Sequence, residues 1–333
     1  MGVNIAEVAR KANVSTATAA RAFASPNLLS PRTRGRVLEA AKQLNYVPNR
    51  LARGLRNGKT QTIAVLTTDL HQRLNTLKLD RLQQEIMQRG YHTLLLQYGD
   101  EENLLAECRN LIDGLVLCCL EERPSLHVLR TFLNFGIPLV SLEPCSGLDI
   151  DVVTADREFG SYLAVKHLQN LGHTRIALAQ VALKSEVVSR RTLGYQCAMQ
   201  DAGLEMQVIT HPGGGQSAFE DGYGLIREAL AQGMRPTAWI FSDDELAVGA
   251  LRAFQEQQIR VPDDVAIVGW DNSPLCDFVR PRLTSVTQPI TETVSRLVER
   301  LLTRLEGVTA AAEATLIRPE LIVRESCGSP DAC

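Results

Sequence analysis

The sequence predicts a small all-α headpiece followed by a larger α/β body of two parallel-sheet lobes. Two patterns support this fold class. The first 60 residues contain three closely spaced helix signals, whereas the rest of the 333-residue chain alternates short apolar runs with helical stretches. The chain is also too long for one small domain, so two or three units are expected.

Charge divides the chain at the same place. Residues 1–60 contain eleven Lys and Arg against two Glu, a net charge of +9. The remaining 273 residues contain 24 basic and 36 acidic residues, a net charge of −12. A basic head on an acidic body is typical of a protein that binds a polyanion. The alternative is a solvated basic face without a partner.

Other features of the sequence exclude several classes of protein. The first residues hold no apolar stretch long enough for a signal peptide, and no run approaches the roughly 20 residues of a membrane span. We therefore expect a cytoplasmic protein that has no membrane contact. The eight cysteines show no CxxC pair and no zinc-finger spacing, so no metal site and no disulfide framework is indicated. Cys118 and Cys119 lie in an apolar run and are expected to pack as small hydrophobes.

Three helices are predicted in the headpiece. The caps are an Asn4–Glu7 capping box, Ser15 before a helix running to about Phe23, and Ser30 before a proline at the first helical position. Apolar residues recur at helical spacing in the first and third helices: Ile5, Val8, Ala9 and Ala12, then Val37, Ala40, Ala41 and Leu44. Two short helices on a tight turn, with a third closing a small core, form a helix-turn-helix.

The second helix has an unusual composition, because "NVSTATAARAFASP" is almost entirely Ala, Ser and Thr. A helix that enters the major groove needs small or hydrogen-bonding side chains on one face. The residues that meet this need are Thr16, Ala17, Thr18 and Arg21. Ala20 and Phe23 are expected to face the core. The headpiece is therefore predicted to bind double-stranded DNA.

In the body, apolar runs alternate with helical patterns. The runs are "TIAVLTTD", "HTLLLQY", "DGLVLCCL", "IPLVSL", "RIALAQ", "AWIFSDD" and "VAIVGWDN", and the helical patterns include "TLKLDRLQQEIMQRG", "GSYLAVKHLQNLG" and "ELAVGALRAFQEQQI". Such alternation predicts parallel sheets covered on both faces, and the length favours two similar lobes. Ligands bind such sheets at the carboxyl ends of the strands, which here carry Asp69, Asp243, Asp244 and Asp271.

Several segments resemble the lactose/galactose-repressor family of bacterial transcriptional regulators. "IAEVARKANVSTATAARAF" and "SPRTRGRVLEAAKQLNY" are similar to its headpiece, and "NYVPNRLARGLRNGKTQTIAVL" is similar to the segment that joins its two domains. "LGHTRIAL", "SRRTLGYQCAMQDAGL", "FSDDELAVGAL", "VPDDVAIVGWDN" and "RPRLTSVTQP" resemble its effector-binding core. The resemblance covers essentially the whole chain. It implies a periplasmic-binding-protein-like body of type I.

The resemblance also implies roles in DNA binding. Thr16 and Ala17 match base-reading positions of the recognition helix, and Arg21 matches a base or phosphate contact. The positions that match the hinge helix include Asn49, Arg50, Ala52 and Leu55. The leucine of that helix wedges into the minor groove and kinks the duplex. A helix this short is expected to form only when it pairs with the partner's hinge on DNA.

In the body, the resemblance implies Arg191 and Asp271 as the principal effector contacts, with Asp243 and Asp156 secondary. A guanidinium fork and carboxylate acceptors can bind the hydrogen-bonding groups of a sugar or purine with directionality. Helix capping is the alternative role for the strand-end carboxylates, and it is the one expected for Asp244. A surface ion pair is the alternative for Arg191.

The first lobe departs from the family pattern. Relatives usually follow the first strand with Asn-Pro-Phe-Phe or a similar aromatic pair, whereas this chain has "DLHQRLNT" after Asp69. His71, Arg73 and Arg191 could together make a basic pocket. We therefore expect an anionic carbohydrate effector, such as a sugar acid or a sugar phosphate.

The expected organisation is a headpiece at 1–46, a hinge at 47–60, an effector-binding and dimerisation domain at 61–325 and a polar tail at 326–333. The tail has no apolar heptads. In the family that the chain resembles, members that tetramerise do so through such a C-terminal helix, so the resemblance favours a homodimer, which would read a near-palindromic operator. The expected function is that of an effector-controlled transcriptional regulator, most simply a repressor. It would be cytoplasmic, and located on the nucleoid when it binds its operator.

Two alternatives belong to other classes of protein. The first is a cytosolic sugar-binding module without a DNA function, against which the +9 headpiece argues. The second is a Rossmann-type enzyme, but no GxGxxG, HExxH or GxSxG pattern occurs. "GLRNGKT" has three residues between its glycines where a phosphate-binding loop needs four. We therefore expect neither enzymatic activity nor a cofactor.

Overall fold

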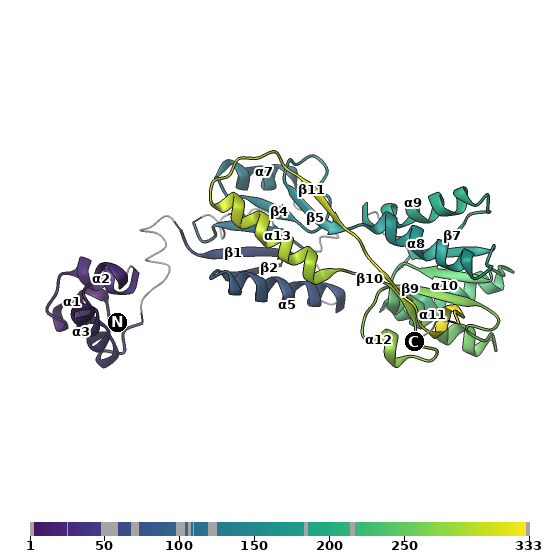
Figure 1. Ribbon diagram of the computed structural model, residues 1–333, viewed down its shortest axis with the longest axis horizontal. Coiled ribbons are helices and arrows are strands. Elements are labelled where there is room, and N and C mark those ends of the chain that lie inside the picture. The colour runs from purple at the N-terminus through teal and green to yellow at the C-terminus, as the bar shows by residue number, and fades with distance from the viewer. Residues whose placement is uncertain are drawn as a thin grey trace. The chain divides into compact units, whose positions relative to one another are not determined.

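The computed structural model describes residues 3–24, 26–47, 59–67, 73–97, 104–105, 108, 110–118, 125–182, 186–213 and 217–330 (Figure 1). The chain divides into two compact units, residues 1–60 and residues 61–333. The first unit contains the headpiece and the second contains the body.

The headpiece consists of α1 (Ile5–Lys11), α2 (Thr16–Ala24), a 3-10 turn η1 (Pro26–Leu28) and α3 (Pro31–Gln43). All three predicted caps are confirmed. Asn4 and Glu7 form the capping box, the Ser15 hydroxyl accepts from the backbone N–H of Thr18 at 3.1 Å, and Ser30 caps α3. These bonds satisfy backbone donors that have no partner within a helix, so the short helices begin where the sequence predicts.

The core of the headpiece is made of small side chains. Its buried members are Val8, Ala9, Ala12, Ala19, Ala22, Val37, Ala40 and Ala41. Phe23 packs against this cluster, with its ring centroid 5.8 Å from that of Tyr46. The expectation that Ala20 also faces the core is wrong. Ala20 is only half-buried, because Ala19 and Ala22, three positions apart, carry the buried stripe of α2.

The first lobe of the body is a parallel sheet with strand order β11-β5-β4-β3-β1-β2. The strands are β1 (Thr62–Thr67), β2 (His92–Gln97), β3 (Gly114–Leu117), β4 (Leu139–Ser141), β5 (Asp151–Ala155) and β11 (Ala314–Ile317). One face packs against α5 (Arg73–Gln88) and α13 (Ile290–Leu305), and the other against α7 (Leu126–Asn134). Alternate strand residues serve the two faces, as the pleat requires: Val65 and Val116 pack with α5 and α13, whereas Leu66 and Leu117 pack with α7.

The second lobe is a six-stranded sheet with order β12-β10-β9-β8-β6-β7. Its strands are β6 (Ile176–Val181), β7 (Gln207–His211), β8 (Ala238–Phe241), β9 (Ala266–Asp271), β10 (Thr284–Thr287) and β12 (Leu321–Ile322), the last antiparallel to β10. The helices α8 (Arg157–Asn170) and α9 (Glu186–Asp201) cover one face. The other face is covered by α10 (Ala218–Ala231) and α11 (Asp244–Glu256), and the short α12 (Leu275–Phe278) follows β9.

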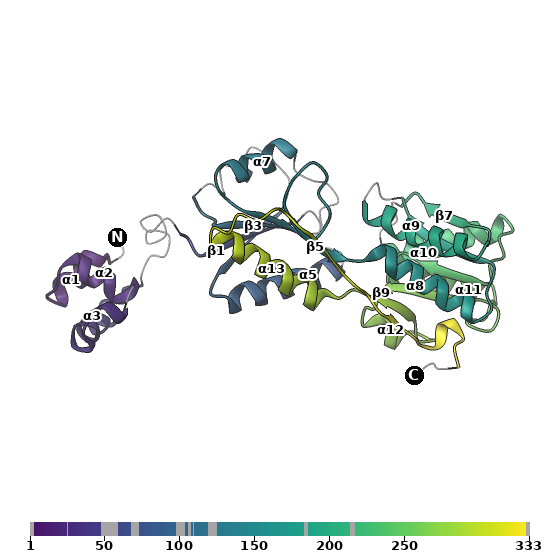
Figure 2. The same ribbon diagram turned by 45° about the horizontal axis from the view of Figure 1, so that its top comes forward.

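The chain passes between the lobes three times (Figure 2). It leaves the first lobe from β5 into α8, returns from β10 into α13, and leaves again from β11 to β12. These crossings bring side chains from distant parts of the sequence to the junction of the lobes. The predicted fold class is therefore confirmed.

All seven predicted apolar runs form strands. Strands β5, β7, β10, β11 and β12 were not predicted from the sequence. Cys118 is buried, as expected, whereas Cys119 lies outside the described residues. Residues 325–327 form a 3-10 turn in which Ser326 and Cys327 are buried, so the first part of the expected tail packs in the second lobe. None of the described helices is long and apolar enough to cross a membrane.

Candidate functional site

The exposed face of α2 carries the predicted DNA-reading residues. Thr16, Ala17 and Arg21 are exposed, while Ala19 and Ala22 hold the opposite face in the core. Thr18 is half-buried, and its hydroxyl lies 2.8 Å from that of Ser15. The face therefore combines small and hydrogen-bonding side chains, as groove entry requires.

The turn between α1 and α2 is tight. Asn13 adopts a left-handed conformation with a φ of 49°, and Arg36 from α3 donates to its carbonyl at 3.2 Å. This bond ties the turn to the third helix. The hinge residues Asn49, Arg50, Ala52 and Leu55 lie outside the described residues.

The second lobe brings Arg191 and Asp271 together. Arg191 Nη2 lies 3.5 Å from Asp271 Oδ1, and the guanidinium stands 4.7 Å from the ring centroid of Trp270. Arg191 is only 8% exposed, so the alternative of a surface ion pair is wrong. Burial lowers the pKa of Arg191, an effect that the charge of Asp271 opposes. A buried guanidinium that stacks on an aromatic ring and pairs with a carboxylate is held in one orientation.

The helix that carries Arg191 packs very closely on α8. A Cβ at Gly194 would lie 2.0 Å from the carbonyl oxygen of Glu158, closer than atoms can approach. Glycine is therefore required at this contact. This close approach sets the position of Arg191, one turn earlier in α9, relative to the first turn of α8.

Asp271 ends β9 in a strained conformation. Its φ of 99° is positive, a backbone conformation that residues other than glycine rarely adopt. The carboxylate Oδ1 also accepts a hydrogen bond from Gln288 Nε2 at 3.1 Å. Strain of this kind persists only where surrounding contacts enforce it, and it is frequent in binding sites.

The expected capping role of Asp244 is wrong, because the preceding residue is the cap. Asp243 Oδ1 accepts from the backbone N–H of Leu246 at 2.7 Å, and Asp244 begins the helix. Asp244 instead accepts from the Ser285 hydroxyl and from the Ser273 backbone N–H, both at 2.6 Å. Burial raises the pKa of Asp243 to about 6 and that of Asp244 to about 7, where the charge of Asp271 adds to the effect.

The remaining predicted effector residues are less well defined. Asp156 caps α8 by accepting from the backbone N–H of Phe159 at 3.0 Å. Asp69 and His71 lie outside the described residues. Arg73 begins α5, but its side chain lies outside the description as well. Of the predicted basic pocket, the structure therefore describes Arg191 alone, and Asp271 neutralises it.

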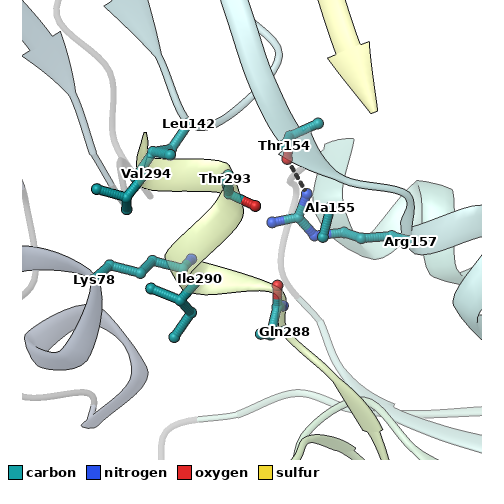
Figure 3. Close-up of a pocket in the computed structure, with 9 residues that line it drawn as sticks. All are labelled: Lys78, Leu142, Thr154, Ala155, Arg157, Gln288, Ile290, Thr293 and Val294. Carbon is teal, nitrogen blue, oxygen red and sulfur yellow. Dashed lines mark hydrogen bonds between the residues drawn. The ribbon is translucent and has the colours of Figure 1, made fainter. Parts of the chain in front are cut away.

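A pocket at the junction of the lobes contains residues that the sequence analysis missed (Figure 3). Its lining comes from the first lobe, from the crossings and from the first residue of α8: Lys78, Leu142, Thr154, Ala155, Arg157, Gln288, Ile290, Thr293 and Val294. Gln288 also bonds to Asp271, so this pocket adjoins the Arg191–Asp271 pair. One signal was available in the sequence. Lys78 lies four residues before the buried Leu82, on the apolar face of an otherwise regular amphipathic helix.

A helix-turn-helix unit joined to a two-lobed body with a polar site at the lobe junction defines a class of protein, the effector-controlled DNA-binding regulators. Comparison with known proteins supports this classification. Residues 4–49 match the family model "Bacterial regulatory proteins, lacI family", and residues 165–327 match a periplasmic binding protein-like domain.

Relatives extend the match over nearly the whole chain. The chain is 31% identical to the ribose operon repressor of Escherichia coli strain K12 over 330 residues, which cover 96% of this chain and 98% of that one. A structure of the lac repressor dimer bound to operator and the anti-inducer ONPF matches with a TM-score of 0.85 at 26% identity, covering 99% of this chain and 100% of that chain. A lacI family regulator from Enterococcus faecium with bound ribose matches with a TM-score of 0.70 at 25% identity, covering 80% and 98%.

The chain belongs to the lacI family of bacterial regulatory proteins. It is a DNA-binding transcriptional regulator and not an enzyme, because the relatives that it matches along their whole length are transcriptional repressors.

Proposed function

We propose that the protein is a homodimeric repressor whose affinity for a near-palindromic operator is set by a small molecule bound beside Arg191 and Asp271. The observation that carries this proposal is the buried Arg191–Asp271 pair at the end of β9. It lies at the carboxyl edge of the sheet, where ligands of such folds bind. The pair offers both donors and acceptors to a ligand.

A carbohydrate fits this chemistry best. Sugar hydroxyls both donate and accept, so they match a guanidinium next to carboxylates. The ribose operon repressor and a regulator with bound ribose are among the similar proteins, which supports the same class of effector. Asp243 and Asp156 are secondary contacts in this proposal, with Asp69 and Arg73 contributed by the first lobe.

On the DNA side, α2 reads the major groove through Thr16, Ala17, Thr18 and Arg21. The hinge contacts are Asn49, Arg50, Ala52 and Leu55, with Leu55 as the minor-groove wedge. We divide the chain into the headpiece at 1–46, the hinge at 47–60, the effector-binding and dimerisation domain at 61–325 and a short tail after it. The protein acts in the cytoplasm, on the nucleoid when it binds its operator.

The coupling between the sites is a two-state equilibrium of the body. The effector binds one arrangement of the lobes more tightly and so changes the separation of the two hinges in the dimer. Hinges that cannot pair leave the headpieces out of register, and operator affinity falls. A corepressor would act through the same linkage in the opposite direction.

The first test is selection of bound duplexes from a random DNA library by the full chain. We expect a palindrome centred on a flexible pyrimidine–purine step. The control is the full chain with Thr16→Ala and Arg21→Ala, which keeps the caps of α2 and should lose the enrichment. If neither protein enriches a sequence, with or without candidate sugars, the binding-module alternative is favoured.

The selected duplex then tests the hinge. Leu55→Ala should weaken operator binding and reduce bending, because the wedge between base steps is lost, while effector affinity stays the same. Fluorescence anisotropy and a gel-based bending assay measure the two effects. Equal bending by the wild type and the variant would contradict the hinge assignment.

The same duplex tests the effector site. Arg191→Ala should retain operator affinity. The effector concentration needed for a half-maximal response should rise about 30-fold or more, because one partner of a buried charge pair is removed. D-ribose is the first probe, followed by a panel of neutral and acidic sugars. The matched control is Arg190→Ala, whose side chain is about half exposed and pairs with Glu158 on the surface. An unchanged dose curve for Arg191→Ala would refute the assignment.

A further inference from the structure

Two buried cations approach the pocket at the lobe junction from opposite sides (Figure 3). Lys78 comes from α5 of the first lobe and is 9% exposed. Arg157, the first residue of α8, is 5% exposed and comes from the side of the second lobe. Charged side chains are rarely buried to this extent unless they are paired with an opposite charge or a ligand.

One carboxylate serves both cations. Glu143 Oε1 lies 2.9 Å from Arg157 Nη2 and 3.7 Å from Lys78 Nζ. Arg157 Nη1 also donates to the Thr154 hydroxyl at 2.6 Å. This group of three ionic side chains holds two positive charges and one negative charge, and all three residues are buried.

The group has unused hydrogen-bonding capacity. Arg157 Nε and Glu143 Oε2 are buried, and neither has a hydrogen-bond partner within the part of the chain that the structure describes. A buried donor or acceptor without a partner is costly, whereas a ligand that satisfies both atoms removes that cost. Arg157 Nε needs an acceptor oxygen, and Glu143 Oε2 needs a donor such as a hydroxyl.

The neighbourhood reinforces the positive character of the pocket. Gln288 lines the pocket together with Arg157 and donates to Asp271, which pairs with Arg191, so the second guanidinium adjoins the pocket. Arg191 Nε is likewise buried without a partner among the described residues. Two arginines with unused donors therefore lie in the same region, together with the hydroxyl of Thr154 and the amide of Gln288 on the pocket wall.

We propose that Lys78 and Arg157 form an anion subsite at the lobe junction, which binds a carboxylate or phosphate group of the effector while Glu143 accepts from one of its hydroxyls. The effector is then a polyhydroxylated acid or a sugar phosphate. That the bound anion belongs to the effector rests on the proposed function. The sequence predicted an anionic ligand because of His71 and Arg73. Here the same class of ligand is inferred from a different pair of cations, Lys78 and Arg157.

An anion in this subsite has a consequence for regulation. Lys78 belongs to the first lobe, whereas Arg157 begins a helix that packs on the second. An anion held by both cations is bound more tightly in the arrangement of the lobes that brings them together. Its binding therefore shifts the population of lobe arrangements. A neutral group at the same place would cause a smaller shift.

The subsite is tested in the full-length protein with inorganic phosphate and acetate as probes, against chloride at equal ionic strength. The midpoint temperature of thermal unfolding of the wild type should rise by about 2–4 °C when the anion concentration is ten times its dissociation constant. Lys78→Met and Arg157→Gln should each lose at least half of the shift. Arg296→Gln removes an exposed cation from α13, which also lines the pocket, and should keep the shift.

Phosphate also stabilises proteins by exclusion from their surface, and the basic headpiece binds it as well. Both effects are common to all variants, so the difference between variants is the readout. Thr293→Leu fills the pocket without removing an ionic group. It should lose the same part of the anion-induced shift as Lys78→Met and Arg157→Gln. This variant keeps the test valid if loss of a buried cation prevents folding.

Equal shifts in the wild type, Lys78→Met, Arg157→Gln and Thr293→Leu would overturn the anion subsite. A shift with both probes supports a subsite open to carboxylates and phosphates, and a shift with phosphate alone supports a phosphate ester. Failure of the operator selection would contradict the proposed function without changing these shifts. The two failures are therefore distinguishable.

Discussion

The two lobes of the body share an architecture but differ in the chemistry at their junction. Each lobe is a six-stranded sheet covered on both faces, and in each the sheet core is apolar. The second lobe contributes Arg191 with the carboxylates Asp271 and Asp243, and Trp270 and Gln288 support this group. The first lobe contributes Lys78 and Glu143, which meet Arg157 from the crossing.

This difference shows how a repeated fold gains specificity. The strand ends are where the backbone leaves the sheet, so side chains there can change without disturbing the core. In the second lobe, Arg191 pairs with a carboxylate and stacks on an aromatic ring. At the first lobe, Lys78 and Arg157 share the single carboxylate of Glu143. The comparison predicts that removal of a carboxylate has a larger effect in the first lobe than in the second.

The largest expected effect is therefore that of Glu143→Gln. The substitution leaves Lys78 and Arg157 buried without their shared carboxylate, at a cost of about 3–5 kcal/mol in the free energy of unfolding. Asp271→Asn should cost less, about 1–2 kcal/mol, because Arg191 keeps its ring contact and the nearby charge of Asp243. Urea unfolding of both variants measures the difference. Equal losses would show that the two lobes hold their cations in the same way.

Glycine contacts give a second comparison between the lobes. A Cβ at Gly194 would meet the backbone carbonyl of Glu158 at 2.0 Å, whereas a Cβ at Gly114 in β3 would meet the side chain of Leu301 at 3.0 Å. A backbone atom cannot move aside without moving its helix. Gly194→Ala should therefore destabilise the body by about 3 kcal/mol and weaken effector binding, because α9 carries Arg191.

The control, Gly114→Ala, should cost about 1 kcal/mol or less, because a leucine side chain can adjust its rotamer. Denaturant unfolding and effector titration of both variants provide the measurements. A Gly194→Ala protein with wild-type stability would mean that the contact between α8 and α9 relaxes easily.

The smallest expected effect is on the pH dependence of stability. The pKa of Asp243 is raised by burial to about 6 and that of Asp244 to about 7, both above the usual value for an aspartate. The folded protein then binds more protons than the unfolded chain between about pH 4 and 7. The stability contributed by these groups is present below the unfolded pKa and is lost as the pH rises through 6 and 7.

Asp243→Asn keeps the helix cap, since asparagine caps as well as aspartate, and it removes one of the two titrations. Stability of the variant should fall less than that of the wild type between pH 5 and 8. His167 and His173 have lowered pKa values from burial and act in the opposite direction, but they do so in both proteins. Parallel pH profiles for the two proteins would show that Asp243 does not titrate in this range.

Much of the headpiece could be predicted because its signals are local. A capping side chain and the backbone N–H that donates to it lie within three residues, and helical spacing assigns Val37, Ala40 and Ala41 to one face. Ala20 was misassigned because alanine has no strong preference for either face. The choice between Ala20 and Ala19 depends on how α2 packs against the other two helices.

In the body, continuous apolar strands were found and other strands were not. The edge strand β7, "QVITH", alternates in exposure, and β10, "TSVT", buries hydroxyl side chains that resemble a loop in sequence. Ser285 is buried because it donates to Asp244, 41 positions away in the chain. Asp244 is thus engaged by Ser285, and Asp243 is the residue that caps α11.

The sequence by itself determined the division into a basic headpiece and an acidic body, the helix caps and the main strands. Each of these depends on composition or on neighbours a few residues apart. Only the tertiary structure decided that Lys78, Glu143 and Arg157 meet at one pocket. Their contact depends on sheet order and on the crossings between the lobes, which are set by the packing of the whole body and not by local spacing.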